Sequence, residues 1–164
     1  MIDLHIDLIE KKLLGTGGGV KNVLNHLLPG PFLVLNSDVI WIDQKDNFFH
    51  LLSNCWDGRK MDALLLLYPV SRKPDENLGD YRKDGNGRIY RRKGLDFSPY
   101  VFTGAQILHD RLFKKSPRKP FSLVSLYDRA EKSGRLFGLV YNGIWHDVGT
   151  KDKLRRIRKN IRML

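Results

Sequence analysis

Apolar and polar residues follow one another along this chain in patterns that predict β-strands separated by α-helices. Residues 2–8 alternate apolar and polar side chains, as a half-buried strand does. Residues 20–28 carry apolar side chains at helical spacing, and Pro29-Gly30 predicts the end of that helix. Residues 32–35 and 63–68 are short, unbroken apolar runs, typical of buried strands.

The middle of the chain predicts another helix, a hairpin and then a strand that leads into a helix. A helix is expected over residues 47–56. Two polar segments within residues 80–93 are joined by Asp84-Gly85-Asn86-Gly87, a strong hairpin signal. Residues 100–102 predict a strand, which we expect to pass through Thr103-Gly104 into a helix over residues 105–113.

The C-terminal part predicts two helices on either side of a strand pair. Ser122 is expected to cap a helix that ends at Lys132. Residues 135–141 and 144–148 are expected to pair with each other around Asn142-Gly143, and Thr150 is expected to cap the last helix. Strands alternating with helices, together with hairpins, indicate an α/β fold with a mixed sheet.

Length and composition indicate one soluble domain over residues 1–164. The longest unbroken apolar run, residues 63–68, is far shorter than the roughly 20 residues of a transmembrane helix. Residues 1–7 carry acids where a secretory signal peptide carries Lys or Arg. The chain has one cysteine, which excludes an internal disulfide. We therefore expect a cytoplasmic protein with no membrane partner.

The formal net charge of +11 is concentrated in three clusters, within residues 82–93, 111–119 and 151–162. Three interpretations remain open for them. Each cluster can be a solvated surface, the whole can suit a small anionic substrate such as a nucleoside triphosphate, or the chain can be a basic nucleic-acid-binding module. No recognised nucleic-acid-binding motif accompanies the charge, so a nucleic-acid partner is not favoured.

Three segments carry candidate chemistry, because ligands of open α/β sheets bind beyond the carboxyl ends of the strands. The glycine run at residues 15–19 would let a flat ligand approach the backbone, although such runs are more often plain turns. Asp38 closes one apolar strand and Asp147 lies at the end of another. Two aspartates at one edge of a sheet could hold Mg²⁺, and an isolated aspartate is more often a helix cap or turn residue.

Four motifs in the same order resemble bacterial sugar-1-phosphate nucleotidyltransferases. They are Leu14-Gly15-Thr16-Gly17-Gly18-Gly19, the segment from Phe32 to Val39, Phe102-Thr103-Gly104, and Trp145-His146-Asp147-Val148-Gly149-Thr150. The chain is most similar to the subgroup of N-acetylmuramate α-1-phosphate uridylyltransferases and mannose-1-phosphate guanylyltransferases. The resemblance covers essentially the whole chain. It implies a Rossmann-like mixed sheet flanked by helices, of the nucleotide-diphospho-sugar transferase type.

The resemblance also implies a reaction and a role for each motif. Thr16, Gly17 and Gly18 would lie against the nucleotide base, and Thr103 and Gly104 would bind the sugar. Asp38 and Asp147 would be the catalytic residues that ligate Mg²⁺. The reaction would join UTP or GTP to a sugar 1-phosphate, giving a nucleotide-diphospho-sugar for the cell envelope and pyrophosphate.

The chain departs from the family pattern in two places. The Gly-rich triphosphate-binding loop of the family is not found before residue 2, so we expect an incomplete N-terminus and no turnover by this chain alone. We also expect either a homodimer or a separate chain that supplies that segment. Residues 88–93 are basic where many relatives have Glu-Lys-Pro, so a basic residue is expected to substitute. The alternative to a nucleotidyltransferase is a catalytically dead remnant or a nucleotide-sugar-binding protein.

Overall fold

The computed structural model describes residues 12–43, 47–73 and 78–161, and the strand predicted over residues 2–8 lies outside them. The helices are α1 (Gly15–Val23), η1 (Leu24–His26), α2 (Phe48–Cys55), η2 (Val70–Arg72), η3 (Asp110–Phe113), α3 (Val124–Lys132) and α4 (Lys151–Ile161). The strands are β1 (Pro31–Leu35), β2 (Val39–Ile42), β3 (Ala63–Pro69), β4 (Tyr81–Lys83), β5 (Ile89–Arg91), β6 (Tyr100–His109), β7 (Leu136–Val140) and β8 (Ile144–Asp147).

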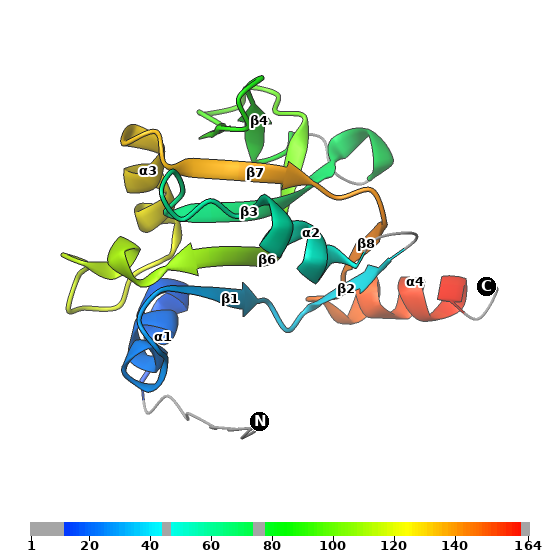
Figure 1. The fold of residues 1–164 in the computed structure, drawn as a ribbon. Helices are drawn as coiled ribbons and strands as arrows, with labels where there is room; N and C mark the ends of the chain where they lie inside the picture. Colours follow the sequence, from blue (N-terminus) through cyan, green and yellow to red (C-terminus); the bar gives the residue numbers. More distant parts are fainter. Residues whose placement is uncertain (1–11, 44–46, 74–77, 162–164) are drawn as a thin grey trace.

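The main sheet is mixed, as predicted. Its strands follow the order β5-β4-β6-β3-β7, and β1 also pairs with β6 (Figure 1). β3 runs parallel to β7, whereas the other pairs are antiparallel. Strand β6 is long enough for Tyr100 to pair with β4 while residues 105–109 pair with β1. A separate two-stranded sheet is formed by β2 and β8.

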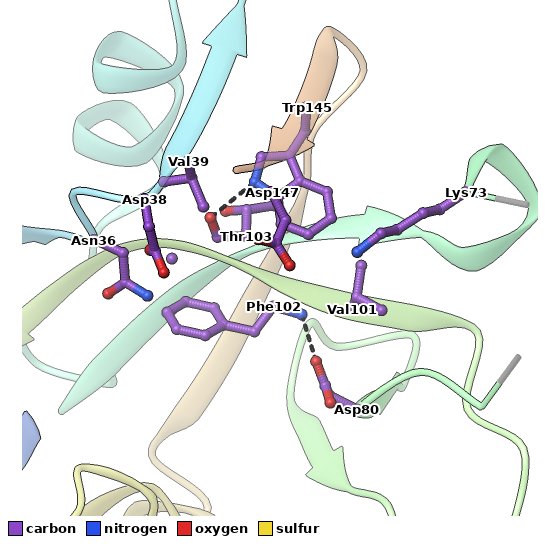
Figure 2. Close-up of a pocket in the computed structure, with 11 residues that line it drawn as sticks. Asn36, Asp38, Val39, Lys73, Asp80, Val101, Phe102, Thr103, Trp145 and Asp147 are labelled. Atoms are coloured by element: carbon purple, nitrogen blue, oxygen red, sulfur yellow. Dashed lines mark hydrogen bonds between the residues drawn. The ribbon is translucent and has the colours of Figure 1, made fainter. Parts of the chain in front are cut away.

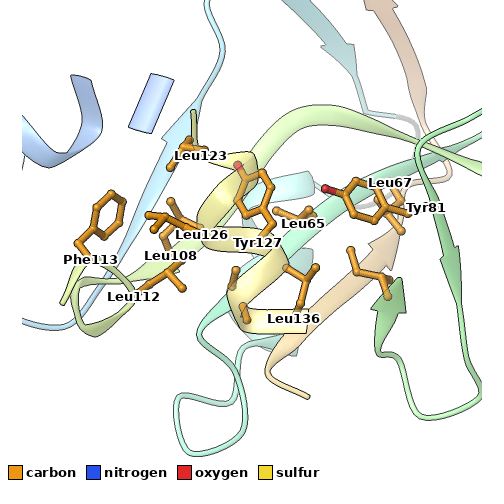
Figure 3. Packing of buried hydrophobic residues seen from close by; sticks show 13 residues of the cluster. Leu65, Leu67, Tyr81, Leu108, Leu112, Phe113, Leu123, Leu126, Tyr127 and Leu136 are labelled. Atoms are coloured by element: carbon orange, nitrogen blue, oxygen red, sulfur yellow. The ribbon is translucent and has the colours of Figure 1, made fainter. Parts of the chain in front are cut away.

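Alternate side chains of β3 enter two hydrophobic cores, one on each face of the main sheet. Leu65 and Leu67 point into the core that α3 covers, where they pack with Tyr127 (Figure 3). Leu64 and Leu66 point into the opposite core, which contains side chains of α2, β7 and β8. β3 is buried on both faces, which explains the unbroken apolar run over residues 63–68.

The helix predicted over residues 105–113 is wrong. Strand β6 continues to His109, and only the short 3₁₀ helix η3 follows. Residues 105–108 are all buried, because β6 lies between β1 and β3 and is covered on both faces. Such a run cannot be distinguished from a buried helix by its periodicity.

The strand pair predicted around Asn142-Gly143 is also wrong, although both strands exist. β7 pairs with β3 in the main sheet, and β8 pairs with β2 in the small sheet. A Cβ atom at Gly143 would lie 2.2 Å from the hydroxyl oxygen of Tyr141 and 2.7 Å from the carbonyl oxygen of Ile42. This glycine therefore permits a close crossing between two sheets and not a hairpin turn.

Other predictions are confirmed. The hairpin over Asp84-Gly85-Asn86-Gly87 joins β4 and β5. Thr150 accepts a hydrogen bond from the Lys153 amide at the start of α4.

The strand at residues 32–35 exists, but its predicted burial is wrong, because Leu33 and Leu35 are each 39% exposed. Across the described residues, no helix combines the length and the apolar character that crossing a membrane requires.

Candidate functional site

A cavity of about 210 Å³ opens where β1 ends, beside the small sheet and the first half of β6 (Figure 2). Its lining combines apolar walls with polar and charged groups, namely Asn36, Asp38, Val39, Lys73, Asp80, Val101, Phe102, Thr103, Gly104, Trp145 and Asp147. The chain order places these residues far apart, and the pairing of β2 with β8 brings the two aspartates together.

Asp38 and Asp147 approach each other across Gly149. A Cβ atom at Gly149 would lie 2.8 Å from Oδ2 of Asp38 and 3.3 Å from Oδ1 of Asp147. The backbone fixes this arrangement, because the Val148 amide donates a 2.8 Å hydrogen bond to the carbonyl oxygen of Asp38. The glycine leaves open the space that a larger residue would fill between the two carboxylates.

Asp147 is held as a carboxylate by its surroundings. Partial burial acts to raise its pKa, but hydrogen bonds from Lys153 Nζ and the Gly149 amide, with the nearby charge of Lys73, lower the pKa below 3.8 overall. Lys153 Nζ lies 2.5 Å from one oxygen of Asp147, and the Gly149 amide lies 2.9 Å from the other. The site therefore presents an ionised oxygen ligand at neutral pH.

The residues present fit a hard cation such as Mg²⁺. Carboxylate oxygens are its preferred protein ligands, and Mg²⁺ commonly uses only one or two of them while keeping bound waters. No group of three or more His, Cys, Asp or Glu side chains that could hold a metal occurs among the described residues. The donor set thus suits a cation shared with a bound substrate, not an all-protein cage.

Lys73 supplies positive charge to this cavity, and sequence reasoning missed it. Its Nζ lies 4.2 Å from the centre of the Trp145 ring, and its side chain extends towards Asp147 (Figure 2). Lys73 comes directly after η2, which follows the buried strand β3. The basic residue was expected within residues 88–93, but none of those residues lines this cavity.

Asp80 is a second lining residue that sequence reasoning missed. Its Oδ2 accepts a 2.9 Å hydrogen bond from the Phe102 amide, which ties the segment before β4 to β6 (Figure 2). The only local signal in the sequence is the pair Gly79-Asp80. Gly79 has a φ of +62°, and a Cβ atom there would lie 2.0 Å from the Ser98 carbonyl oxygen, so this turn requires glycine.

Thr103 and Gly104 line the cavity from the middle of β6, not from the end of a strand as predicted. The Thr103 side chain is fully buried and donates a 2.9 Å hydrogen bond to the Leu66 carbonyl oxygen. Gly104 has a φ of +86°, and a Cβ atom there would lie 2.9 Å from Cβ of Asn36. Both residues shape the wall of the cavity, and sugar binding by them stays a prediction.

Thr16, Gly17 and Gly18 lie in the first turn of α1 and do not line the cavity of Asp38. The Gly17 and Gly18 amides donate to the Phe121 carbonyl oxygen at 2.9 and 3.3 Å. Thr16 Oγ1 accepts a hydrogen bond from the Leu123 amide. The glycine run therefore packs against the segment before α3, and its contact with a nucleotide stays a prediction that rests on the resemblance.

Comparison with known proteins identifies the fold and the kinship. No protein-family model matches the chain. N-acetylmuramate alpha-1-phosphate uridylyltransferase of Caulobacter vibrioides is 31% identical over 137 residues, which cover 83% of this chain and 57% of that protein. This chain is similar to the sugar-1-phosphate nucleotidyltransferases. The resemblance predicted from the four motifs is confirmed.

Solved structures show the same fold. A putative glucose-1-phosphate thymidylyltransferase from Bacillus anthracis superposes with a TM-score of 0.72 at 20% identity, over 94% of this chain and 64% of that one. HddC from Yersinia pseudotuberculosis superposes with a TM-score of 0.69 at 21% identity, over 94% and 65%. The predicted nucleotide-diphospho-sugar transferase fold is therefore confirmed. The chain spans 57% of the length of the Caulobacter relative.

Proposed function

We propose that this chain carries the metal and sugar-phosphate half of a sugar-1-phosphate nucleotidyltransferase site. The observation that supports the proposal best is the convergence of Asp38 and Asp147 on Gly149 at the rim of one cavity. Two carboxylate groups and a nearby ammonium group suit a substrate that combines a divalent cation with phosphate oxygens. The relatives named above support the class of reaction.

In the proposed reaction, an oxygen of the sugar 1-phosphate attacks the α-phosphorus of the nucleoside triphosphate in line. A new P–O bond forms, the bond from the α-phosphorus to the bridging oxygen breaks, and pyrophosphate leaves with that electron pair. Such chemistry needs positioning and neutralised phosphate charge more than a protein acid or base. Bound Mg²⁺ would supply part of that neutralisation.

The residues of this chain contribute charge and position. Asp38 and Asp147 would hold the cation. The Gly149 amide orients one carboxylate oxygen of Asp147, and the Val148 amide fixes the backbone of Asp38. Lys73 would pair with a phosphate oxygen beside the indole of Trp145. Thr103 and Gly104 would form the wall against which the sugar lies, with Thr103 fixed by its hydrogen bond to Leu66. UTP or GTP is the proposed nucleotide.

Pyrophosphate release tests this proposal. Turnover would be measured with UTP or GTP and a panel of sugar 1-phosphates, for the chain alone and for a fusion to the Gly-rich N-terminal segment of a relative. We expect turnover by the fusion and its loss in the fusion carrying Asp147→Asn. Magnesium-dependent binding of a nucleotide-sugar without turnover in either protein would favour the alternative, a nucleotide-sugar-binding protein. No binding and no turnover would refute the assignment.

A further inference from the structure

A second cavity, of about 330 Å³, lies between α1 and the loop over residues 114–121. It has no lining residue in common with the cavity of Asp38 and Asp147. Lys21, Arg118 and Lys119 contribute cations to its lining, and Asn22 and Asn25 contribute side-chain amides. The lining includes no Asp or Glu, so its formal charge is entirely positive.

The cations of this loop have no ionic partner among the residues that the structure describes. Lys114, Lys115, Arg118 and Lys119 are exposed, and within the described part of the chain none of their side chains makes an ion pair or a hydrogen bond. Arg91, by contrast, is exposed but makes a 2.7 Å ion pair with Asp128. Four like charges within six positions repel one another, and a bound anion would relieve that repulsion.

The loop is nevertheless held in one arrangement. Lys21 Nζ donates to the carbonyl oxygens of Ser116 and Pro117 at 3.3 and 3.0 Å, which attaches the loop to α1. The Phe121 amide donates to the Leu14 carbonyl oxygen at 3.0 Å on the other side of the cavity. Lys115 has a φ of +63°, a left-handed conformation that a lysine rarely adopts and that clusters at functional sites.

We propose that this cavity binds a phosphate-bearing small molecule, separately from the site of Asp38 and Asp147. Its volume suits a compact ligand of a few phosphate groups and a small organic part. Arg118 and Lys119 would pair with phosphate oxygens, and the amides of Asn22 and Asn25 would contact the remaining polar groups. A small ligand is favoured over a nucleic acid, because Lys21, Arg118 and Lys119 line one concavity and do not form a stripe.

The cost of binding would be small, because the loop is already ordered. Lys21 would remain attached to the loop and present its third N–H to the ligand, since an ammonium group has three donors. Phe121 and Leu14 would give an apolar wall for the organic part. This site does not depend on the metal and sugar assignments of the Asp38 cavity, because it shares no residue with that cavity. Its lining does include Gly18, which the resemblance places against the nucleotide base.

The test is binding of inorganic pyrophosphate to the full chain in EDTA, which removes divalent cations from the Asp38 cavity. We expect saturable binding in calorimetry, with amide chemical-shift changes centred on Gly18, Lys21, Arg118 and Lys119. The double variant R118Q/K119Q should weaken the affinity by about tenfold or more, since it removes two charge-assisted contacts. The matched control, K93Q/K132Q, removes the same charge from two exposed lysines that line neither cavity.

Three outcomes would overturn the proposal. One is equal weakening by R118Q/K119Q and the control, which would mean a general effect of net charge. Another is the absence of saturable binding, or shifts confined to the surroundings of Asp38 and Asp147. The third is binding of random-sequence DNA through the same residues that is tighter than the binding of pyrophosphate and depends steeply on salt. That result would make a nucleic acid the ligand. Unchanged thermal unfolding of both variants confirms that they fold.

Discussion

The indole N–H of Trp145 donates a 2.9 Å hydrogen bond to the carbonyl oxygen of Thr103. This bond joins the small sheet, which carries Asp147, to the central strand of the main sheet. Trp145 is buried, so its loss would leave the Thr103 carbonyl without that donor. The position of Asp147 relative to the rest of the cavity therefore depends on Trp145.

Trp145→Phe should destabilise the protein by about 2 kcal/mol, because a buried carbonyl oxygen loses its partner. The matched control is Trp41→Phe, at the position paired with Trp145 in the small sheet. The Trp41 indole N–H is buried and has no hydrogen-bond partner among the described residues, so Phe removes no such bond. Urea unfolding of both variants measures the difference. An equal loss of stability would show that ring packing, and not the hydrogen bond, connects the sheets.

Removing either carboxylate of the cavity should remove the response to magnesium. We expect Mg²⁺ to raise the unfolding temperature of the native chain, because a ligand that binds only the folded state stabilises it. Asp38→Asn and Asp147→Asn should each abolish that shift. Asp152→Asn is the control, since Asp152 is an exposed acid on α4 that does not line the cavity. A shift that survives in either cavity variant would contradict the assignment of that residue.

Gly149→Ala should weaken Mg²⁺ binding at the same site, although it removes neither carboxylate. The added Cβ atom would lie 2.8 Å from Oδ2 of Asp38, so the two carboxylates must move. Gly149 does not have a positive φ, and its backbone accepts alanine. We expect weaker Mg²⁺ binding in calorimetry, by about tenfold, with little loss of stability. Gly85→Ala is the control, because a Cβ atom at Gly85 would meet no atom within 4 Å.

Stability at acid pH should depend on Asp62, which lies away from the cavity. Its Oδ1 accepts from Arg111 Nε at 2.6 Å and from Arg135 Nε at 2.8 Å. Partial burial acts to raise the pKa of Asp62, but the two arginines outweigh it and lower the pKa below 3.8. The unfolded chain therefore takes up a proton at higher pH than the folded one. This contribution to stability is present above pH 3.8 and is lost as the pH falls through the lowered pKa.

Asp62→Asn should cost about 3 kcal/mol near neutral pH, since it leaves two arginines around an uncharged partner. The variant should also lose less stability than the native chain between pH 5 and pH 3, which denaturant unfolding at a series of pH values measures. Asp96→Asn serves as a control at an exposed aspartate. A parallel pH dependence for the native chain and Asp62→Asn would contradict the stated origin of the acid sensitivity.

The sequence allowed the elements around the site to be predicted where a local pattern decides them. The run at residues 63–68 needs burial on both faces, and the glycines of Asp84-Gly85-Asn86-Gly87 specify a turn. Residues 105–108 have an equally apolar pattern, but only the pairing with β1 and β3 makes them a strand. Tertiary contacts of this kind leave no periodic signal in the sequence.

The residues of the site divide in the same way, into those that a local pattern predicts and those that the sequence pattern does not reveal. Asp38 and Asp147 were predicted to meet because each follows an apolar strand, and the structure places both at one cavity. The partner of the strand that carries Asp147 was predicted incorrectly, since β8 pairs with β2 and residues 136–140 pair with β3. Lys73 was missed because it follows a short 3₁₀ helix, whose side-chain directions no apolar pattern reveals.

Lys73 is expected to act on phosphate affinity more than on stability. Its Nζ lies over the Trp145 ring, and its charge contributes to the lowered pKa of Asp147. Lys73→Gln keeps most of the length of the side chain and removes the charge. Affinity for a sugar 1-phosphate in the presence of Mg²⁺ should fall by about tenfold, the effect of one charge-assisted hydrogen bond.

Lys93→Gln removes the same charge from an exposed residue outside the cavity and should change the affinity less than about twofold. Calorimetric titrations of the three proteins measure the difference. Equal affinities would mean that Lys73 only balances the charge of Asp147. A loss of Mg²⁺ binding itself in Lys73→Gln would contradict the proposed contact with phosphate, because removing a cation should favour binding of another cation at the neighbouring carboxylates.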